Sequence, residues 1–349
     1  MSNAKLSKAK NAKFDEFYTQ YYDIENELKE YFDYDSSQFQ GKTVLLPCDD
    51  PEWSNFTRYF AQNFERLGLK KLISTSYAPE SRKYKYPQQL SLFEEEAPQF
   101  DPQKSKVRGK IFVLDRDVSG DGRVNLDDMQ WDYLEGDGDF RSDEVRHLRD
   151  DADIIVTNPP FSLFREYFSW VMESNKKFLM IANKLCFSYK DVFSYVMDGK
   201  LWAGYRRWSG GMWFETKSTE DIDKVVDGVS MKNVPTIWIT NLEHGRRHEP
   251  LQLMTIEQNL KHSKHKEIRG KIAYDHYDNY DAIEVPFTDA IPSDYEGAMG
   301  VPITFMEKFC PEQFVIIGNE YIMNISKGRC YVKGKRLSPR LFIRKLTNL

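Results

Sequence analysis

The stretch Ala152–Phe164, with the sequence ADIIVTNPPFSLF, contains the pattern that decides the fold. Its first half, Asp153–Thr157, is built on an apolar run of the kind that forms a buried strand. From Ser162 onward, aromatic and aliphatic side chains recur at helical spacing, so a helix is expected to begin there. A strand that passes through a sharp turn into a helix is the unit of an α/β sheet. The stretch therefore predicts an α/β fold in which Asn158–Phe161 form the turn at a strand end.

The same alternation continues on both sides of this stretch. Short apolar runs alternate with amphipathic segments, which is typical of a parallel sheet with helical crossovers. A helix is expected from about Asn55, with Ser54 as its N-cap and Gly68 at its end. Including Asp153–Thr157, we predict a sheet of about seven strands. The other expected strands contain Val44–Leu46, Lys71–Ile73, Lys110–Leu114, Phe178–Ile181, Leu201–Ala203 and Thr236–Ile239.

Two changes in the pattern divide the chain. Residues 79–104 are rich in Pro, Gln, Glu and Lys and have no periodicity, so we expect a mobile insertion there. After Leu242 the sheet pattern gives way to short segments rich in Tyr and His. We therefore predict an α/β core at residues 1–242 and a second module at residues 243–349.

The composition limits the class of protein. The net charge is −5 with 30% charged residues, so the molecule as a whole is not a basic nucleic-acid binder. From Lys327 onward, however, there are eight Lys or Arg and no Asp or Glu. Such a run is a solvated tail unless other features indicate nucleic acid, in which case phosphate contacts are expected. The four cysteines include no C-x-x-C pair, and no apolar run approaches a membrane span, which predicts a soluble, cytoplasmic protein.

The turn at the end of the strand carries groups suited to one kind of reaction. The Asn158 side-chain oxygen and the Pro159 carbonyl can accept the two N–H bonds of an exocyclic amino group, and Phe161 can stack on a base. Pro159 and Pro160 stiffen the turn and remove two backbone donors. A turn without function is the alternative, because Asn and Pro are ordinary turn residues. The four residues predict methyl transfer from a sulfonium to an amino nitrogen, and they leave open whether the acceptor is adenine, guanine in RNA or a protein amide.

Further segments narrow the acceptor by their resemblance to a known family. Together with Ala152–Phe164, they resemble the EcoRI-type adenine-specific DNA methyltransferases, in the same order, from about Lys13 to Gly318. The segments that carry this resemblance are Asp15–Tyr21, Cys48–Pro51 followed by Ser54–Phe56, Gly136–Ser142, Asp278–Ile283 and Met299–Phe305.

The resemblance implies a Rossmann-like sheet that binds S-adenosylmethionine, with a DNA-recognition module after the catalytic core. It implies that Phe17, Tyr18 and Thr19 line the methionine end of the cofactor. Cys48, Asp49 and Asp50 are implied to form the turn after the first strand. Asp139 is implied to accept from the amino group of the cofactor adenine, and Phe140 to pack on its ring.

The chain departs from the broader methyltransferase pattern at two places. The turn after the first strand, Pro47–Pro51, contains no glycine to let the backbone approach a cofactor. No acidic residue for the ribose hydroxyls follows the second strand, where Ser74–Ser76 stand. Asp49 or Asp50 is the candidate for that role, and a solvated turn that caps a helix is the alternative for these two carboxylates.

Together these features predict a site-specific adenine N6-methyltransferase of a restriction–modification system. Its partners are expected to be double-stranded DNA and a cognate restriction endonuclease, with no membrane, and the protein is expected to be a monomer. The target adenine must be flipped out of the duplex to reach the turn. An enzyme that methylates RNA or a protein amide, and an inactive DNA-binding relative, are the rival interpretations. The candidate DNA contacts are Trp213, Arg246, Arg247, Lys333, Lys335 and Arg336, with Lys327, Arg329 and Arg340 also in the basic C-terminal run.

Metal sites are weaker hypotheses. Sulfonium methyl transfer needs no metal, and the His pairs of the chain lack the further ligands that zinc requires. One loop has oxygen side chains at the spacing of a calcium loop, although an acidic hairpin tip is the alternative. The five residues of that loop are Asp117, Ser119, Asp121, Asn125 and Asp128.

Overall fold

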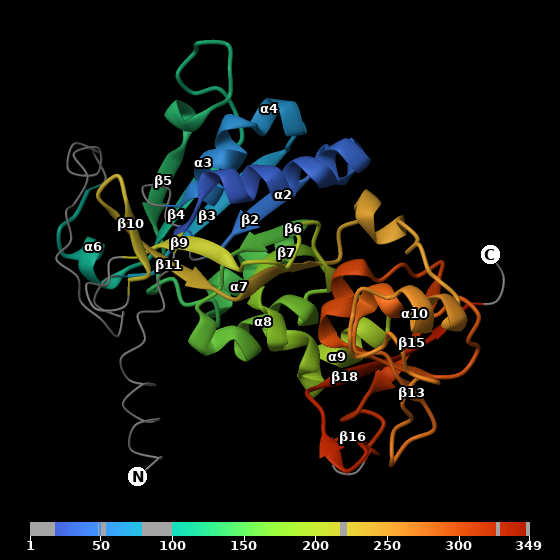
Figure 1. The fold of residues 1–349 in the computed structure, drawn as a ribbon. Coiled ribbons are helices and arrows are strands. Elements are labelled where there is room, and N and C mark those ends of the chain that lie inside the picture. The colour runs from blue at the N-terminus through green and yellow to red at the C-terminus, as the bar shows by residue number, and fades with distance from the viewer. Residues whose placement is uncertain are drawn as a thin grey trace, which may run out of the picture. The chain divides into compact units, whose positions relative to one another are not determined.

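The computed structural model describes residues 18–47, 49, 54–78, 100–216, 222–325 and 329–346 (Figure 1). It divides into two compact units, and each is considered by itself. The first runs to Asn183 and resumes at Gly210–Leu242, while the second contains Lys184–Ser209 and the chain from Glu243. Lys184–Ser209, which we expected in the core, thus groups with the C-terminal unit. Most of the expected insertion at residues 79–104 lies outside the described residues.

A large mixed sheet forms the centre of the first unit, as an α/β fold requires. Its four central strands are parallel, because β2 pairs in parallel with both β3 and β6, and β6 with β7. The strands of this sheet that belong to the first unit are, in sheet order, β5 (Gln130–Tyr133), β4 (Lys110–Leu114), β3 (Lys71–Ser76), β2 (Thr43–Leu46), β6 (Ile154–Thr157), β7 (Lys177–Asn183) and β12 (Thr236–Thr240).

The expected parallel arrangement holds for the central strands but not at the edges of the sheet. Strands β4 and β5 on one side, and β12 on the other, run antiparallel to their neighbours. A parallel neighbour requires a crossover, usually a helix. The link from β4 to β5 contains only the short turn η3 (Leu126–Asp128), so the chain folds back on itself.

The segment predicted as one helix from Asn55 to Gly68 forms two, α3 (Asn55–Gln62) and α4 (Phe64–Leu67). Ser54 caps α3, since its Oγ accepts from the backbone N–H of Phe56 at 3.1 Å, and Gly68 ends the next helix in the left-handed region. The apolar faces of these helices pack with β2 and β6 in one buried core. The helical elements of the unit are α2 (Tyr21–Tyr34), η1 (Ser36–Gln38), α3 (Asn55–Gln62), α4 (Phe64–Leu67), α6 (Lys104–Val107), α7 (Asp143–Asp151), η4 (Phe161–Leu163) and α8 (Phe164–Glu173).

A second, smaller sheet pairs Tyr18 and Thr19, the described strand residues of the N-terminal motif, with β9 (Met212–Glu215). In it Thr19 lies opposite Phe214 in antiparallel register. Its strands are β1 (Tyr18–Thr19), β9 (Met212–Glu215), β11 (Val229–Val234) and β10 (Lys224–Val226), in that order.

The C-terminal unit has its own sheet and its own core. The sheet order is β13-β14-β18-β15, and a separate hairpin joins β16 to β17. None of the helices in the described part of the chain is long and apolar enough to cross a membrane. The elements of the unit are η5 (Lys184–Ser188), α9 (Lys190–Met197), β8 (Trp202–Ala203), η6 (Gly245–His248), α10 (Ile256–His262), β13 (Ile283–Glu284), η7 (Thr288–Ala290), β14 (Met299–Pro302), η8 (Ile303–Lys308), β15 (Phe314–Asn319), β16 (Tyr331–Val332), β17 (Lys335–Arg336) and β18 (Arg340–Lys345).

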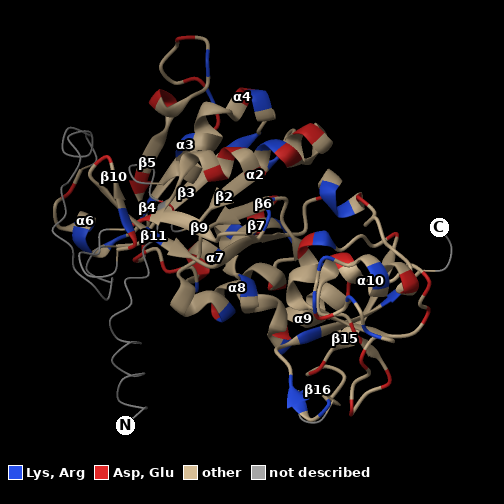
Figure 2. Ribbon diagram, in the orientation of Figure 1, with Lys and Arg blue, Asp and Glu red and all other residues tan. Residues whose placement is uncertain are grey.

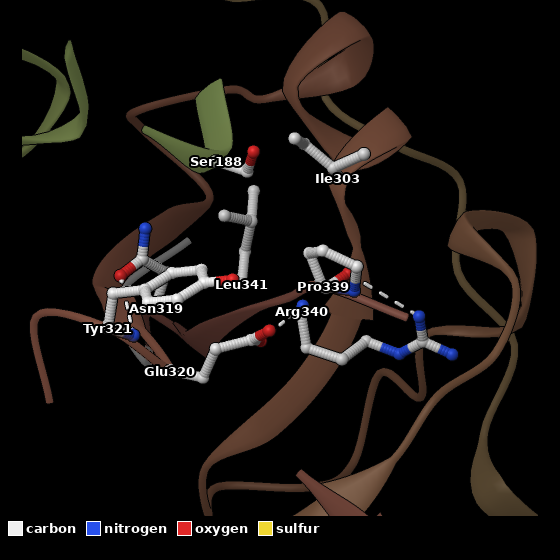
Figure 3. Close-up of a pocket in the computed structure, with 8 residues that line it drawn as sticks. All are labelled: Ser188, Ile303, Asn319, Glu320, Tyr321, Pro339, Arg340 and Leu341. Atoms are coloured by element: carbon white, nitrogen blue, oxygen red, sulfur yellow. Dashed lines mark hydrogen bonds between the residues drawn. The ribbon is translucent and has the colours of Figure 1, made fainter. Parts of the chain in front are cut away.

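Buried ionic contacts hold this sheet together. The Arg340 guanidinium pairs with Glu284 at 2.7 Å, with both side chains less than a tenth exposed, and Tyr277 donates its hydroxyl to Glu284. A Cβ on Gly300 would lie 2.5 Å from the Tyr277 ring, so only glycine leaves room for this network. The backbone N–H of Arg340 donates to Glu320 at 2.6 Å, beside a small hollow (Figure 3). Arg340 was expected among the exposed cations of the C-terminal run, but its charge is buried and neutralised.

Candidate active site

The order of the central strands marks where a ligand is expected. The chain leaves β2 for β3 on one side and later returns to β6 on the other side of β2 (Figure 1). Ligands of open α/β sheets bind beyond the carboxyl ends of the strands, where the strand order reverses. The turns after β2 and β6 both lie at this switch point, and they contain the two groups of residues predicted from the sequence.

A hydrogen bond fastens the turn after β6 to the turn after β2. The Thr157 hydroxyl, which is buried, donates to the Pro47 carbonyl at 3.3 Å. Pro159 is buried, whereas Asn158 and Phe161 are partly exposed. The Asn158 carboxamide oxygen is itself enclosed. The predicted catalytic turn is therefore partly accessible, and the residue that precedes it, Thr157, fastens it to the predicted cofactor turn.

Residues of two other elements, α3 and β3, hold Asp49 in the turn after β2. Its backbone carbonyl accepts from the Thr57 hydroxyl at 3.2 Å and from the Ser74 hydroxyl. Its carboxylate accepts from Ser54 at 2.9 Å, at the beginning of α3. Ser74, which stands where an acidic residue was expected, is fully buried and stabilises this turn.

The N-terminal motif joins the same place through Thr19. The Asn55 side chain, in the first turn of α3, donates to the Thr19 carbonyl at 2.8 Å. The Thr19 hydroxyl oxygen is buried and makes no hydrogen bond to any residue that the structure describes. Of the other predicted cofactor residues, Phe17, Cys48 and Asp50 and the side chain of Tyr18 lie outside the described residues, so their roles stay predictions.

A glycine loop supplies carboxylates at the carboxyl end of β3. The Asp137 carbonyl accepts from the Ala78 N–H at 2.7 Å, just beyond β3. Gly138 has a φ of +84°, and a Cβ there would lie 2.3 Å from the Ser76 carbonyl oxygen. Glycine is therefore required for the loop to approach the strand, and the loop places Asp137 and Asp139 there. Asp139 was predicted from the sequence, but Asp137 was not. The two glycines that flank Asp137 are the sequence feature that indicates a close approach of this loop to the strand.

Asp139 and Phe140 are both firmly held. Arg141 pairs with Asp139 at 2.6 Å, and hydrogen bonds from Arg141 lower the pKa of the Asp139 carboxyl despite its partial burial. Phe140 is 4% exposed, with its ring 4.7 Å from that of Tyr167 and 5.8 Å from that of Trp170. The contacts of both residues with the cofactor adenine stay predictions. The Asp139 carboxylate proposed to accept from the adenine amino group is ionised, and the Phe140 ring proposed to pack on the adenine is part of an aromatic cluster.

The aromatic partner of the catalytic turn is Phe214. Its ring lies 6.2 Å from that of Phe161, edge to face. Trp213, a predicted DNA contact, precedes it in β9, where successive side chains point to opposite faces. The Lys224 ammonium lies 3.8 Å above the Trp213 ring. Phe214 is fully buried, so it supports Phe161, and the DNA contact assigned to Trp213 stays a prediction.

The predicted basic residues differ in their contacts and in their exposure to solvent. Arg247 pairs with Glu243 at 2.8 Å and stacks on Trp202, whereas Arg246 stacks on Tyr205 at 3.9 Å. Beside them the His244 ring is buried and bonded to the Ala203 carbonyl at 2.9 Å, and burial lowers the pKa of His244 to about 4. This histidine is thus neutral at pH 7. The other predicted cations, Lys333, Lys335 and Arg336, are exposed on the β16–β17 hairpin.

The loop with calcium-like spacing directs its oxygens at its own backbone. The Asp128 carboxylate accepts three backbone N–H groups of the loop at 2.8–2.9 Å. Asp117 accepts from the backbone of both loop glycines, at 2.6 and 2.8 Å. Asp121 and Asn125 likewise accept from residues two positions ahead. Over the described ranges, no group of three or more His, Cys, Asp or Glu has the arrangement of a metal site. The geometry is that of an acidic hairpin tip.

We predict that Asp128 makes this hairpin sensitive to acid. Hydrogen bonds from Ser119 and Asn125 lower the pKa of Asp128 from 3.8 to about 2. A carboxyl whose pKa is lowered by folding stabilises the loop above its unfolded pKa, and this stability is lost as the pH falls from about 4 towards 2. Amide chemical shifts of Val118 and Ser119 should titrate in that range, and Asp128→Asn should abolish the transition. Asp127→Asn, an exposed neighbour, should leave it unchanged; an unaltered titration in Asp128→Asn would show that another group is responsible.

The sequence comparisons agree with one another over almost the whole chain. A family model described as adenine-specific methyltransferase EcoRI matches residues 5–339. Type II methyltransferase M.EcoRI of Escherichia coli is 40% identical over 353 residues, which cover 96% of this chain and 98% of that protein. Type II methyltransferase M.MpnI of Mycoplasma pneumoniae is 32% identical over 99% of both chains. No solved structure matches the chain.

These matches confirm the family and the adenine-specific DNA methyltransferase activity expected from the sequence. The turns that the structure places at the switch point, after β2 and β6, both lie inside the matched range. With a family model over most of its length and a relative at 40% identity, the chain belongs to the EcoRI family of adenine-specific methyltransferases.

Proposed function

We propose that the protein transfers a methyl group from S-adenosylmethionine to N6 of adenine within a short specific sequence of duplex DNA. The observation that carries this proposal is the Thr157–Pro47 hydrogen bond, which joins the Asn158–Phe161 turn to the turn after β2 at the switch point. Amino-group methylation needs an acceptor site and a methyl donor side by side. The two adjoining turns are suited to provide them.

The residues around the turn after β2 fit S-adenosylmethionine. The buried Thr19 hydroxyl has no protein partner in the described part of the chain and is suited to bond the polar methionine end. The carboxylates of Asp137 and Asp139, at the end of β3, are suited to accept from the ribose hydroxyls and the adenine amino group. Asp49, bonded to Ser54 at the beginning of α3, lies in the turn after β2, the strand next to β3 in the sheet. When bound, the cofactor supplies a methyl group on a sulfonium.

In this proposal the chain acts by binding and orienting the amino group. The Asn158 side-chain oxygen and the Pro159 carbonyl accept its two N–H bonds, which directs the nitrogen lone pair away from the base plane. Phe161, held by Phe214, stacks on the base. The base reaches the turn only when it is flipped out of the duplex, at a cost of a few kcal/mol. No strong base is required, because the proton leaves a nitrogen that has become cationic.

A methyl-transfer assay with several acceptors tests this function. The protein is incubated with tritiated S-adenosylmethionine and with duplex DNA, RNA or a protein mixture. We expect label in DNA alone, recovered as N6-methyl-2′-deoxyadenosine after digestion to nucleosides. Label in RNA or protein would instead support a different amino acceptor. Calorimetry that detects no binding of the cofactor or its demethylated product would contradict an enzymatic role altogether.

The biological setting follows from this activity. A sequence-specific adenine methyltransferase is suited to protect DNA from a cognate restriction endonuclease in the same cytoplasm. One protein chain contains both turns, so we propose that a monomer performs the reaction. Sedimentation of the protein with and without a short duplex tests this stoichiometry.

A further inference from the structure

The β16–β17 hairpin is a small element that requires outside support. Its four strand residues pair only with each other, Tyr331 with Arg336 and Val332 with Lys335. The turn residues Lys333 and Gly334 have φ values of +50° and +74°, as a two-residue hairpin turn of the favoured twist requires. An isolated two-stranded hairpin is only marginally stable in water. Contacts from elsewhere must therefore fix its position.

Asp278 and Asn279 provide that support. The two Asp278 oxygens accept from the backbone N–H groups of Lys333, at 2.9 Å, and Gly334, at 2.7 Å. The Asn279 side chain accepts from Tyr331 at 3.3 Å and donates to the Arg329 carbonyl at 2.9 Å. Both residues belong to Asp278–Ile283, one of the segments that resemble the family. This segment has no part in the candidate active site. The side chains of Asp278 and Asn279 hold the hairpin that carries the basic residues.

The β16–β17 hairpin has exposed cationic side chains. Lys335 and Arg336 are exposed on β17, and Figure 2 shows Lys and Arg gathered at this end of the C-terminal unit. Lys333 differs, because its ammonium pairs with Asp275 at 2.7 Å, which also pairs with Lys271 at 2.6 Å. Asp275 therefore offsets part of the charge of Lys333 and Lys271, whereas the two strand cations face solvent.

We infer that this hairpin is a DNA-binding ribbon, in which Lys335 and Arg336 contact backbone phosphates and Asp278 positions them. The inference rests on the proposed function, because it presumes that duplex DNA is the substrate. A two-stranded ribbon fits into a DNA groove, and Lys and Arg on its strands can reach phosphates at the groove edge. A rigid turn lowers the conformational entropy that binding would otherwise cost.

The salt dependence of DNA affinity tests the two cations. Each phosphate contact adds about 0.9 to the slope of log affinity against log salt, so Lys335→Gln/Arg336→Gln should lower the slope by about 1.8. The loss should be equal on specific and unrelated duplexes, because phosphates carry no sequence information. The control Lys261→Gln/Lys266→Gln removes the same charge from exposed positions of this unit and should keep the wild-type slope. Equal slopes for the two double variants would overturn the inference.

Two substitutions at Asp278 test its positioning role. Asp278→Ala and Asp278→Asn remove the same negative charge, which by itself would strengthen binding to DNA. Asn retains an oxygen acceptor for the turn, whereas Ala does not. We expect several-fold weaker DNA binding for Asp278→Ala and at least wild-type affinity for Asp278→Asn. Tighter binding by both variants would show that Asp278 acts only through its charge.

These outcomes are separate from the fate of the proposed function. If the wild-type protein neither binds nor methylates duplex DNA, the proposed function fails. If it methylates DNA while the hairpin variants keep the wild-type slope, only the assignment of the ribbon fails.

Discussion

Asn158→Ala is expected to lower kcat for methyl transfer by about a hundredfold to a thousandfold, with DNA affinity nearly unchanged. The side-chain oxygen is proposed to accept an N–H of the target amino group, and loss of one such preorganised contact costs about 10²–10³ in rate. Alanine keeps the backbone of the turn, including the Pro159 carbonyl. Single-turnover methylation and duplex binding measured on the same preparation separate the two effects.

Ser162→Ala is the matched control for this substitution. Ser162 is exposed and lies in η4, directly after the turn, so its loss removes a polar side chain without removing the proposed acceptor. Near-full activity of Asn158→Ala, or an equal loss in both variants, would contradict the role assigned to the amide.

Gly138→Ala is expected to have the second large effect, on cofactor binding. Its Cβ would lie 2.3 Å from the Ser76 carbonyl, so the loop that carries Asp137 and Asp139 must move away from β3. A displacement that costs about 1.4 kcal/mol in binding lowers the affinity tenfold, and we expect a loss of at least about that size for S-adenosylmethionine. Calorimetric titration of the purified variant measures it.

Gly120→Ala separates the steric clash from backbone strain. Gly120 also has a positive φ, of +79°, but a Cβ there meets no atom within 4 Å. Both variants carry the strain of an L-residue in the left-handed region, on the order of 1–2 kcal/mol. Cofactor affinity close to wild type in Gly138→Ala, or an equal loss in Gly120→Ala, would show that the approach of the loop to β3 is not important.

The parts of the site that follow from local sequence were predictable. The Asn158–Phe161 turn follows a buried strand and precedes a helix, and both neighbours have clear periodicity. Ser54 as the cap of α3 follows from the same kind of local signal. Such features depend on residues a few positions apart, which a sequence pattern records directly.

Contacts between distant residues were not predictable in the same way. The Ser74 hydroxyl donates to the Asp49 carbonyl, 25 positions away in the sequence. This contact explains why a serine stands where an acidic residue was expected. Arg340 is neutralised by Glu284, 56 positions away, so a cation of the basic run is part of the core. The antiparallel direction of β4 and β5 likewise depends on the path of a loop rather than on strand periodicity.

Adenine methylation in a host that expresses this chain tests the central claim most directly. Genomic DNA is sequenced by a method that detects N6-methyladenine, from cells with the wild-type chain and from cells with Asn158→Ala at equal protein level. We predict N6-methyladenine at one recurring short sequence with the wild-type chain and its absence with the variant. DNA without N6-methyladenine in the wild-type cells, or the same methylation in both, would contradict the account.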